Sequence, residues 1–120
     1  MQILIVDDSP IMRMIVKKTI KEAGFSGLKI AEASNGEEGL KKVGEVKPAL
    51  ILSDWNMPVM TGIDFLRKLK ESGSATPFGF VTTEATSEMR QIAKEAGARF
   101  IIAKPFTAQS FSDALMPFIH

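Results

Sequence analysis

The chain has 120 residues, of which 45% are hydrophobic and 24% are charged, so it is long enough to bury the core of one globular domain. Its fifteen basic and fourteen acidic residues leave a formal net charge of +1, which argues against a dominant nucleic-acid or anionic-membrane partner, because such binding needs clustered excess Lys and Arg. The lack of cysteine excludes disulfides and thiolate chemistry, and the single histidine, His120, excludes sites built from several histidines.

The N-terminal part of the chain alternates between strand and helix patterns. A continuous apolar run predicts a buried strand at residues 3–6. Ser9 and Pro10 are typical of a helix cap and a first helical residue, and Gly24 supplies a stop. The apolar residues between them repeat at helical spacing: Met12, Ile15, Val16 and Ile20. A second strand is predicted at residues 28–33.

The same alternation continues through the middle of the chain. An Asn-Gly turn precedes a weaker helix at residues 37–45. The apolar run at 50–53 predicts a third strand, which ends abruptly in Asp54. A helix is predicted from Gly62 to about Ser72, with three residues facing inward: Ile63, Leu66 and Leu69.

The C-terminal part repeats the pattern twice. A fourth strand is predicted at residues 78–82, and Gly79 inside it indicates a close backbone approach. A helix with one apolar face and a glycine stop follows: Met89, Ile92, Ala93 and Ala96, then Gly97. A fifth strand is predicted at residues 100–103. The last helix has apolar residues at helical spacing and is cut short by Pro117: Phe111, Ala114, Leu115 and Phe118.

Five alternations of strand and helix with short connections predict an α/β fold. Right-handed crossovers between successive strands give a parallel sheet with helices on both faces, which is a three-layer sandwich. No repeat or linker interrupts the pattern, so we expect one domain over residues 1–120 with no effector domain attached. The N-terminal apolar run is too short for a signal peptide or a membrane span, so we expect a cytoplasmic location and no membrane insertion.

Polar residues end or follow four of the predicted strands. Asp7 and Asp8 follow the first strand, Asp54 ends the third, Thr82 ends the fourth, and Lys104 follows the fifth. Because parallel strands carry their carboxyl ends to one edge of the sheet, where open α/β folds bind ligands, we expect these side chains to converge. Each residue alone has a plainer explanation as a helix cap or an ordinary turn residue. Their shared position at one edge favours a functional site.

A cluster of carboxylates at this edge needs a counter-charge. At about 4 Å and an effective dielectric near 20, each like-charged pair repels by roughly 4 kcal/mol. A divalent cation with oxygen ligands, most naturally Mg2+, satisfies the acids and keeps positions for water and a phosphoryl oxygen. Lys104 and Thr82 supply a positive charge and a hydrogen-bond donor opposite the metal. The pattern predicts an anion site around a carboxylate nucleophile, Asp54, which suits formation of an aspartyl phosphate.

Several short motifs follow one another in a specific order along the chain: Leu4-Ile5-Val6-Asp7-Asp8-Ser9, Asp54-Trp55-Asn56-Met57-Pro58, Gly62, Val81-Thr82 with Glu84-Ala85, and Lys104-Pro105-Phe106. In this order and at these separations, the whole chain resembles the response-regulator receiver domains, in particular their stand-alone, CheY-like chemotaxis type. The resemblance implies a flavodoxin-like, doubly wound fold with five helices and five parallel strands in the order 2-1-3-4-5, and that order comes from the resemblance alone.

The resemblance implies roles in phosphoryl transfer and metal binding. Asp54 would accept a phosphoryl group from a sensor histidine kinase or a histidine phosphotransfer domain, and would also contribute to the metal site. Asp8 would ligate Mg2+ directly, and Asp7 would assist through water. Asn56 would contribute its backbone carbonyl.

Further roles follow for residues around the phosphoryl group. Thr82 would hydrogen-bond to that group and Lys104 would pair with it, and the peptide bond between Lys104 and Pro105 would be cis. Asn56 and Glu84 lie two residues past Asp54 and Thr82, where receivers vary and set the lifetime of the phosphate. This pair matches the chemotaxis type, so we expect quick self-dephosphorylation.

The switch position departs from the family pattern. Three residues before the lysine the family carries Tyr or Phe, whereas this chain has Ile101. Phe100 is adjacent, but successive residues of a strand point to opposite faces. No hydroxyl at Ile101 can signal through a hydrogen bond. We therefore expect Ile101, Thr82 and Phe106 to form the switch without the family's ring-based coupling.

Output is expected through a surface that binds a protein target of the phosphorylated monomer. Candidate contacts lie on the face made by the fourth helix, the fifth strand and the fifth helix: Arg90, Lys94, Arg99, Ile101, Phe106 and Gln109. The plainer explanation for the cations is a solvated helix face. Two other functions remain open, namely a docking module that ignores phosphorylation and a Mg2+-dependent phosphatase or nuclease.

Overall fold

The computed structural model describes residues 2–83 and 85–119 and confirms the predicted alternation of strands and helices. The strands are β1 (Gln2–Val6), β2 (Lys29–Ala33), β3 (Leu50–Ser53), β4 (Phe78–Thr82) and β5 (Phe100–Ala103). The helices are α1 (Pro10–Glu22), α2 (Gly36–Val46), α3 (Gly62–Glu71), α4 (Ser87–Ala96) and α5 (Ala108–Leu115). Within the described part of the chain, no helix combines the length and the hydropathy that crossing a membrane requires.

All five strands pair in parallel in one sheet with the order β2-β1-β3-β4-β5, as the resemblance implied. The register places Val6 of β1 beside Ala33 of β2 and Ser53 of β3. The carboxyl ends of these three strands therefore reach the same edge together. The chain reverses direction across the sheet after β2, so the central β1–β3 pair lies at the point where ligands bind in open sheets.

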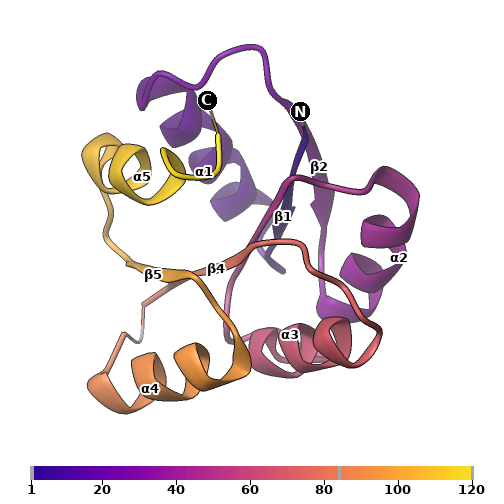
Figure 1. The fold of residues 1–120 in the computed structure, drawn as a ribbon. Helices are drawn as coiled ribbons and strands as arrows, with labels where there is room; N and C mark the ends of the chain where they lie inside the picture. Colours follow the sequence, from indigo (N-terminus) through magenta and orange to yellow (C-terminus); the bar gives the residue numbers. More distant parts are fainter. Residues whose placement is uncertain (1, 84, 120) are drawn as a thin grey trace.

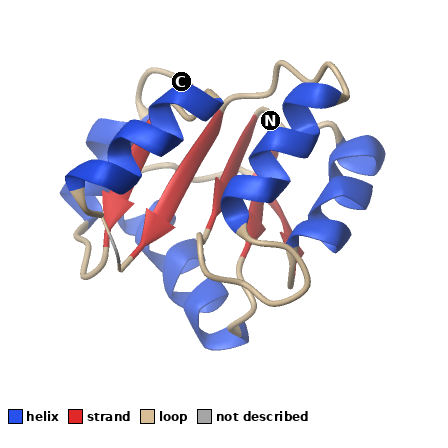
Figure 2. Cartoon of the chain, turned by 90° about the horizontal axis from the view of Figure 1, so that it is seen from below, coloured by secondary structure: helices blue, strands red, loops and turns tan. Residues whose placement is uncertain are grey.

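Helices cover both faces of the sheet, which gives the expected three layers (Figures 1 and 2). Alternation along β1 divides its side chains between the two faces: Leu4 and Val6 pack with α2, α3 and α4, whereas Ile3 and Ile5 pack with α1 and α5. All four of these side chains are buried. Because β1 is covered on both sides, its sequence is a continuous apolar run rather than an alternating one.

Each helix begins at a hydroxyl or amide side chain that accepts a hydrogen bond from a backbone N–H in the first turn: Ser9, Asn35, Thr61, Thr86 and Thr107. Such caps satisfy backbone donors that have no partner inside the helix. The caps fix where the strand-to-helix connections end. They therefore set the length of the loops that carry the polar residues at the sheet edge.

The last helix, α5, ends at Leu115, so Phe118 lies beyond it, and β2 begins one residue later than predicted, at Lys29. The structure also departs from the sequence pattern at Ile15 and Gly79. Ile15 in the α1 repeat is 42% exposed, because it lies beyond the margin of the stripe that Val16 and Ile20 bury. The close approach expected at Gly79 involves a side chain and not another backbone: a Cβ there would collide with the Phe100 ring. Position 79 must therefore lack a side chain, because the Phe100 ring of the neighbouring strand occupies that space.

Candidate functional site

The tip of β1 is an ordered turn that carries two acids. Asp7 is buried, its backbone N–H donates to the Ala33 carbonyl at 3.1 Å, and its carboxylate accepts from the Ser9 N–H at 2.9 Å. Ser9 in turn caps α1. Asp8, between them, is exposed. The turn therefore holds one carboxylate against the sheet and presents the next one to solvent.

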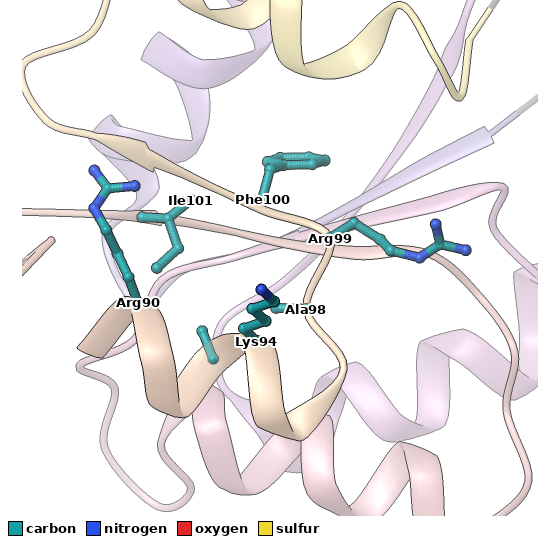
Figure 3. Close-up of a pocket in the computed structure, with 7 residues that line it drawn as sticks. Arg90, Lys94, Ala98, Arg99, Phe100 and Ile101 are labelled. Carbon is teal, nitrogen blue, oxygen red and sulfur yellow. The ribbon is translucent and has the colours of Figure 1, made fainter. Parts of the chain in front are cut away.

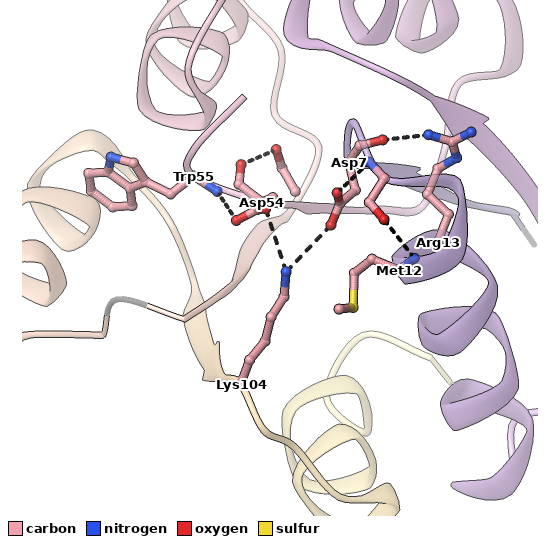
Figure 4. Close-up of polar contacts among 8 residues, drawn as sticks. Asp7, Met12, Arg13, Asp54, Trp55 and Lys104 are labelled. Carbon is pink, nitrogen blue, oxygen red and sulfur yellow. Dashed lines mark hydrogen bonds and ion pairs between the residues drawn. The ribbon is translucent and has the colours of Figure 1, made fainter. Parts of the chain in front are cut away.

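The tip of β3 places Asp54 beside this turn (Figure 4). The Asp54 backbone N–H donates to the Val6 carbonyl at 2.9 Å, and its carboxylate accepts from the Trp55 N–H at 2.7 Å. Gly62 closes the loop, with its N–H donating to the Trp55 carbonyl at 2.8 Å. A Cβ at position 62 would collide with the Asp54 carbonyl oxygen, which explains why the motif needs glycine there.

Lys104 links the two buried acids. Its Nζ lies 3.5 Å from a carboxylate oxygen of Asp7 and 3.5 Å from one of Asp54, and its side chain is 11% exposed. The Lys104 backbone N–H donates to the carbonyl of Thr82, the fully buried last residue of β4, at 2.8 Å. The peptide bond between Lys104 and Pro105 is cis, as expected. Strand ends from β1, β3, β4 and β5 thus meet at one place.

The donor set at this place fits a hard divalent cation. Asp7, Asp8 and Asp54 each offer one carboxylate oxygen, and these oxygens lie within 4.8 Å of one another. With Lys104 they leave a formal charge of −2 when all four groups are ionised. Oxygen ligands and this charge suit Mg2+, which is bound through few carboxylates and keeps several waters.

Burial raises the pKa of Asp7 above its ordinary value of 3.8. The Ser9 N–H and Lys104 act in the opposite direction, while the neighbouring charges of Asp54 and Asp8 raise this pKa further. Desolvation and like charge both disfavour the ionised acid. The protein therefore holds Asp7 in a position where its negative charge is costly.

The other predicted site residues are more dispersed. Asn56 is exposed in the loop after β3, and Glu84 lies outside the described residues. Ile101 is partly buried on the α4 side of the sheet, whereas Phe106 packs edge-to-face on Phe111 of α5, with ring centroids 4.8 Å apart. The predicted switch residues Ile101 and Phe106 therefore contact opposite layers of the fold.

Sequence reasoning missed an ion-pair network next to the acids. Arg13 donates to the backbone carbonyl of Asp7 at 2.6 Å and to the Glu32 carboxylate at 2.9 Å, and Lys17 also pairs with Glu32 at 2.9 Å. The Lys17 hydrogen bond, followed by that from Arg13, lowers the pKa of Glu32 despite its partial burial. The sequence held one indication of this network. Glu32 is a carboxylate within the short strand β2, and Arg13 and Lys17 are two cations four residues apart in α1.

Comparison with known proteins identifies the family. The family model described as the response regulator receiver domain matches residues 3–116. The chain belongs to the response-regulator receiver domain family. This receiver is 38% identical to the chemotaxis protein CheY of Pseudomonas aeruginosa over 117 residues, covering 96% of this chain and 93% of that protein. It is 34% identical to CheY1 of Helicobacter pylori over 118 residues, covering 96% and 94% of the two chains.

Solved structures agree with this assignment. The chemotaxis protein CheY4 of Vibrio cholerae superposes on the receiver with a TM-score of 0.85 at 33% identity, and the match covers 98% of each chain. The family and fold implied by the sequence motifs are thus confirmed. Membership places the chain among two-component signalling phosphoacceptors, which are not enzymes acting on an external substrate.

The raised pKa of Asp7 predicts a pH-dependent effect on stability. Because the folded-state pKa lies above the unfolded one, ionising Asp7 destabilises the fold as pH rises from 3.8 through the raised value. In Mg2+-free buffer at pH 7, the receiver carrying Asp7→Asn should have a higher free energy of unfolding than the native protein, and the difference should shrink below pH 4. Urea unfolding across this range measures it.

The exposed acid Asp113 on α5 supplies the control. Asp113→Asn should leave the pH dependence of the native protein unchanged. A native receiver that is at least as stable as the Asp7→Asn variant at pH 7 without Mg2+ would contradict the account of the buried charge.

Proposed function

We propose that this receiver accepts a phosphoryl group on Asp54 from a phosphohistidine of a sensor histidine kinase or a histidine phosphotransfer domain, and that the phosphorylated form binds a protein target. The observation that carries the proposal is the cluster of Asp7, Asp8 and Asp54 with Lys104 between two of its members. We further propose that residues 1–120 act as one receiver domain.

The backbone holds Asp54 in place for nucleophilic attack. One of its carboxylate oxygens accepts from the Trp55 N–H and the other faces Lys104. In the transfer, an Asp54 oxygen forms a bond to phosphorus as the phosphorus–nitrogen bond of the phosphohistidine breaks, and the imidazole leaves. The product is a mixed anhydride of phosphoric acid and the Asp54 carboxylate, whose side chain is 14% exposed before the transfer.

Asp7, Asp8 and Asp54 would hold Mg2+, with the Asn56 backbone carbonyl as a further oxygen ligand. A bound cation would neutralise charge on the acids and on the incoming phosphoryl oxygens. Without it, a phosphoryl dianion would approach a cluster that already carries excess negative charge. The proposal therefore requires Mg2+ for phosphorylation.

Lys104 and Thr82 would bind the phosphoryl group once it is attached. The 3.5 Å separations from Lys104 to the two carboxylates are long for hydrogen bonds of a charged pair, so this ammonium group is free to shift to a phosphoryl oxygen. Asn56 and Glu84 would tune self-dephosphorylation, because they lie two residues beyond Asp54 and Thr82. Asn56 is exposed in the loop after β3.

A surface on the α4 side of the sheet fits the protein target. A surface cavity of about 310 Å3 lies between α4 and β5, with Ile101 and Ala98 among its apolar lining and cations around it: Arg90, Lys94 and Arg99 (Figure 3). Ile101 points toward α4, whereas Phe100 points to the other face. The charge and the apolar floor suit an acidic segment with one apolar side chain. Phe106 and Gln109 do not line this cavity.

Phosphorylation of Asp54 predicts a covalent adduct that mass spectrometry detects. Incubation of the receiver with Mg2+ and acetyl phosphate should add one base-labile phosphoryl group to the intact protein, because the activated nucleophile accepts phosphoryl groups from small donors as well. Asp54→Asn and removal of Mg2+ with EDTA should each abolish the adduct. Asp64→Asn, which changes an exposed acid in α3, should leave it intact.

Persistence of the adduct in Asp54→Asn would overturn the assignment of the nucleophile. Release of phosphate from an added phosphoester, at a rate that Asp54→Asn abolishes, would instead support the phosphatase alternative.

The proposed output surface predicts a partner interaction that depends on phosphorylation. Immobilised receiver treated with beryllofluoride, a phosphoryl mimic, should retain a target from cell extract that the untreated receiver does not retain. Reversing charge at Arg90 and Lys94 to Glu should remove this retention, because an acidic segment would then be repelled. The same reversal at Lys18 and Lys21, two exposed cations of α1, should not remove it.

Equal retention by native protein and by Asp54→Asn under phosphorylating conditions would favour the docking-module alternative. Loss of retention with the α1 charge reversal and not with the α4 reversal would place the target on another face.

A further inference from the structure

Arg13 joins three elements around the β1 tip. Figure 4 shows its contact with Asp7. It lies in the first turns of α1, its Nη1 donates to the Asp7 backbone carbonyl at 2.6 Å, and its Nε donates to the Glu32 carboxylate of β2 at 2.9 Å. Its side chain is 16% exposed. A guanidinium presents its donors in a rigid plane, so one group braces a helix, a strand end and a neighbouring strand together.

The Asp7 carbonyl belongs to the peptide bond that connects Asp7 to Asp8. Because a peptide unit is planar, the direction of this carbonyl also fixes where the Cα of Asp8 lies relative to Asp7. The Asp7 side chain is itself fixed by the Ser9 N–H. The hydrogen bond from Arg13 therefore sets the orientation of the unit from which the exposed Asp8 carboxylate projects.

Glu32 orients Arg13 and is held in turn by Lys17. Lys17 Nζ lies 2.9 Å from one Glu32 oxygen, while Arg13 Nε lies 2.9 Å from the other. Lys17 makes the same kind of ion pair as Arg13 and lies one helical turn further along α1. Of the two cations, Arg13 is the one whose hydrogen bond reaches the acid turn.

We propose that Arg13 is a positioning residue for the metal-binding acids, with Glu32 holding its guanidinium against the peptide between Asp7 and Asp8. The proposal rests on the proposed function, since it assumes that these acids bind Mg2+. Removing the brace lets the peptide rotate, and Asp8 then spends less time in the geometry that closes the cation site. Ligand-orienting partners of this kind typically change metal affinity by about 10–100-fold.

Isothermal titration of the full chain with MgCl2 tests the proposal. Arg13→Met should weaken Mg2+ binding by about tenfold, and Arg13→Lys should give an intermediate value, because an ammonium lacks the planar fork needed to hold both partners. Glu32→Gln should also weaken binding, through the loss of the orienting charge. Lys17→Met is the matched control and should change affinity by less than about twofold.

Amide hydrogen exchange in Mg2+-free protein gives a second readout that needs no bound metal. The Ser9 N–H should exchange faster in Arg13→Met than in Lys17→Met, since the turn that protects it is released. If the pair between Arg13 and Glu32 only stabilised the fold, Arg13→Met and Lys17→Met would lower the free energy of unfolding by similar amounts. Amide exchange in α1 and β2 would then also change similarly in the two variants. If Arg13→Met fails to fold, the exchange of the Ser9 N–H is compared between Glu32→Gln and Lys17→Met instead.

Unchanged Mg2+ affinity and unchanged Ser9 exchange in Arg13→Met and Glu32→Gln would overturn the proposal. Equal losses in Lys17→Met would overturn it too, because that variant leaves the hydrogen bond to Asp7 in place. Failure of the native protein to bind Mg2+ would count against the proposed function, whereas the exchange comparison would still decide whether Arg13 orders the turn.

Discussion

Repulsion among carboxylates that the backbone forces together is the constraint on which the site depends. Three acids offer oxygens within 4.8 Å of one another, and one ammonium group lies between two of them. Each unscreened pair at such a distance opposes folding by up to about 4 kcal/mol. In the proposed function, this excess charge favours binding of a cation, and transfer of a phosphoryl group would change the charge at the site substantially. Lys104, set between Asp7 and Asp54, is the group best placed to respond.

The sheet supplies the rigidity that keeps these charges together. β1 and β3 are buried on both faces, and the pairing of Val6 with Ser53 brings the following residues, Asp7 and Asp54, out of the sheet side by side. Helix caps and the close approach of Gly62 then fix the loops that follow. Apolar packing far from solvent is thus used to hold a polar cluster in an arrangement that the cluster itself disfavours.

The fold was largely predictable because β-branched runs, caps and glycine stops all agree along this chain, and the parallel connection rule then brings the strand ends to one edge. The convergence of Asp7, Asp54 and Lys104 followed from that topology. The strand order needed the family resemblance, because hydrophobic pattern does not say which strands pair. The Arg13–Glu32 pair was missed because charged residues on a helix and an edge strand look solvated in sequence. The separation of Ile101 from Phe106 depends on side-chain direction, which element boundaries do not give.

The most direct measurement of the central claim is chemical trapping of the phosphorylated residue. Borohydride reduces an aspartyl phosphate to homoserine, and peptide mass spectrometry then locates the change in the sequence. After treatment with Mg2+ and a phosphohistidine donor, the account predicts homoserine at position 54 and at neither Asp7 nor Asp8. Homoserine at position 7 or 8, or a stable phosphoester on a hydroxyl residue with position 54 unchanged, would contradict it.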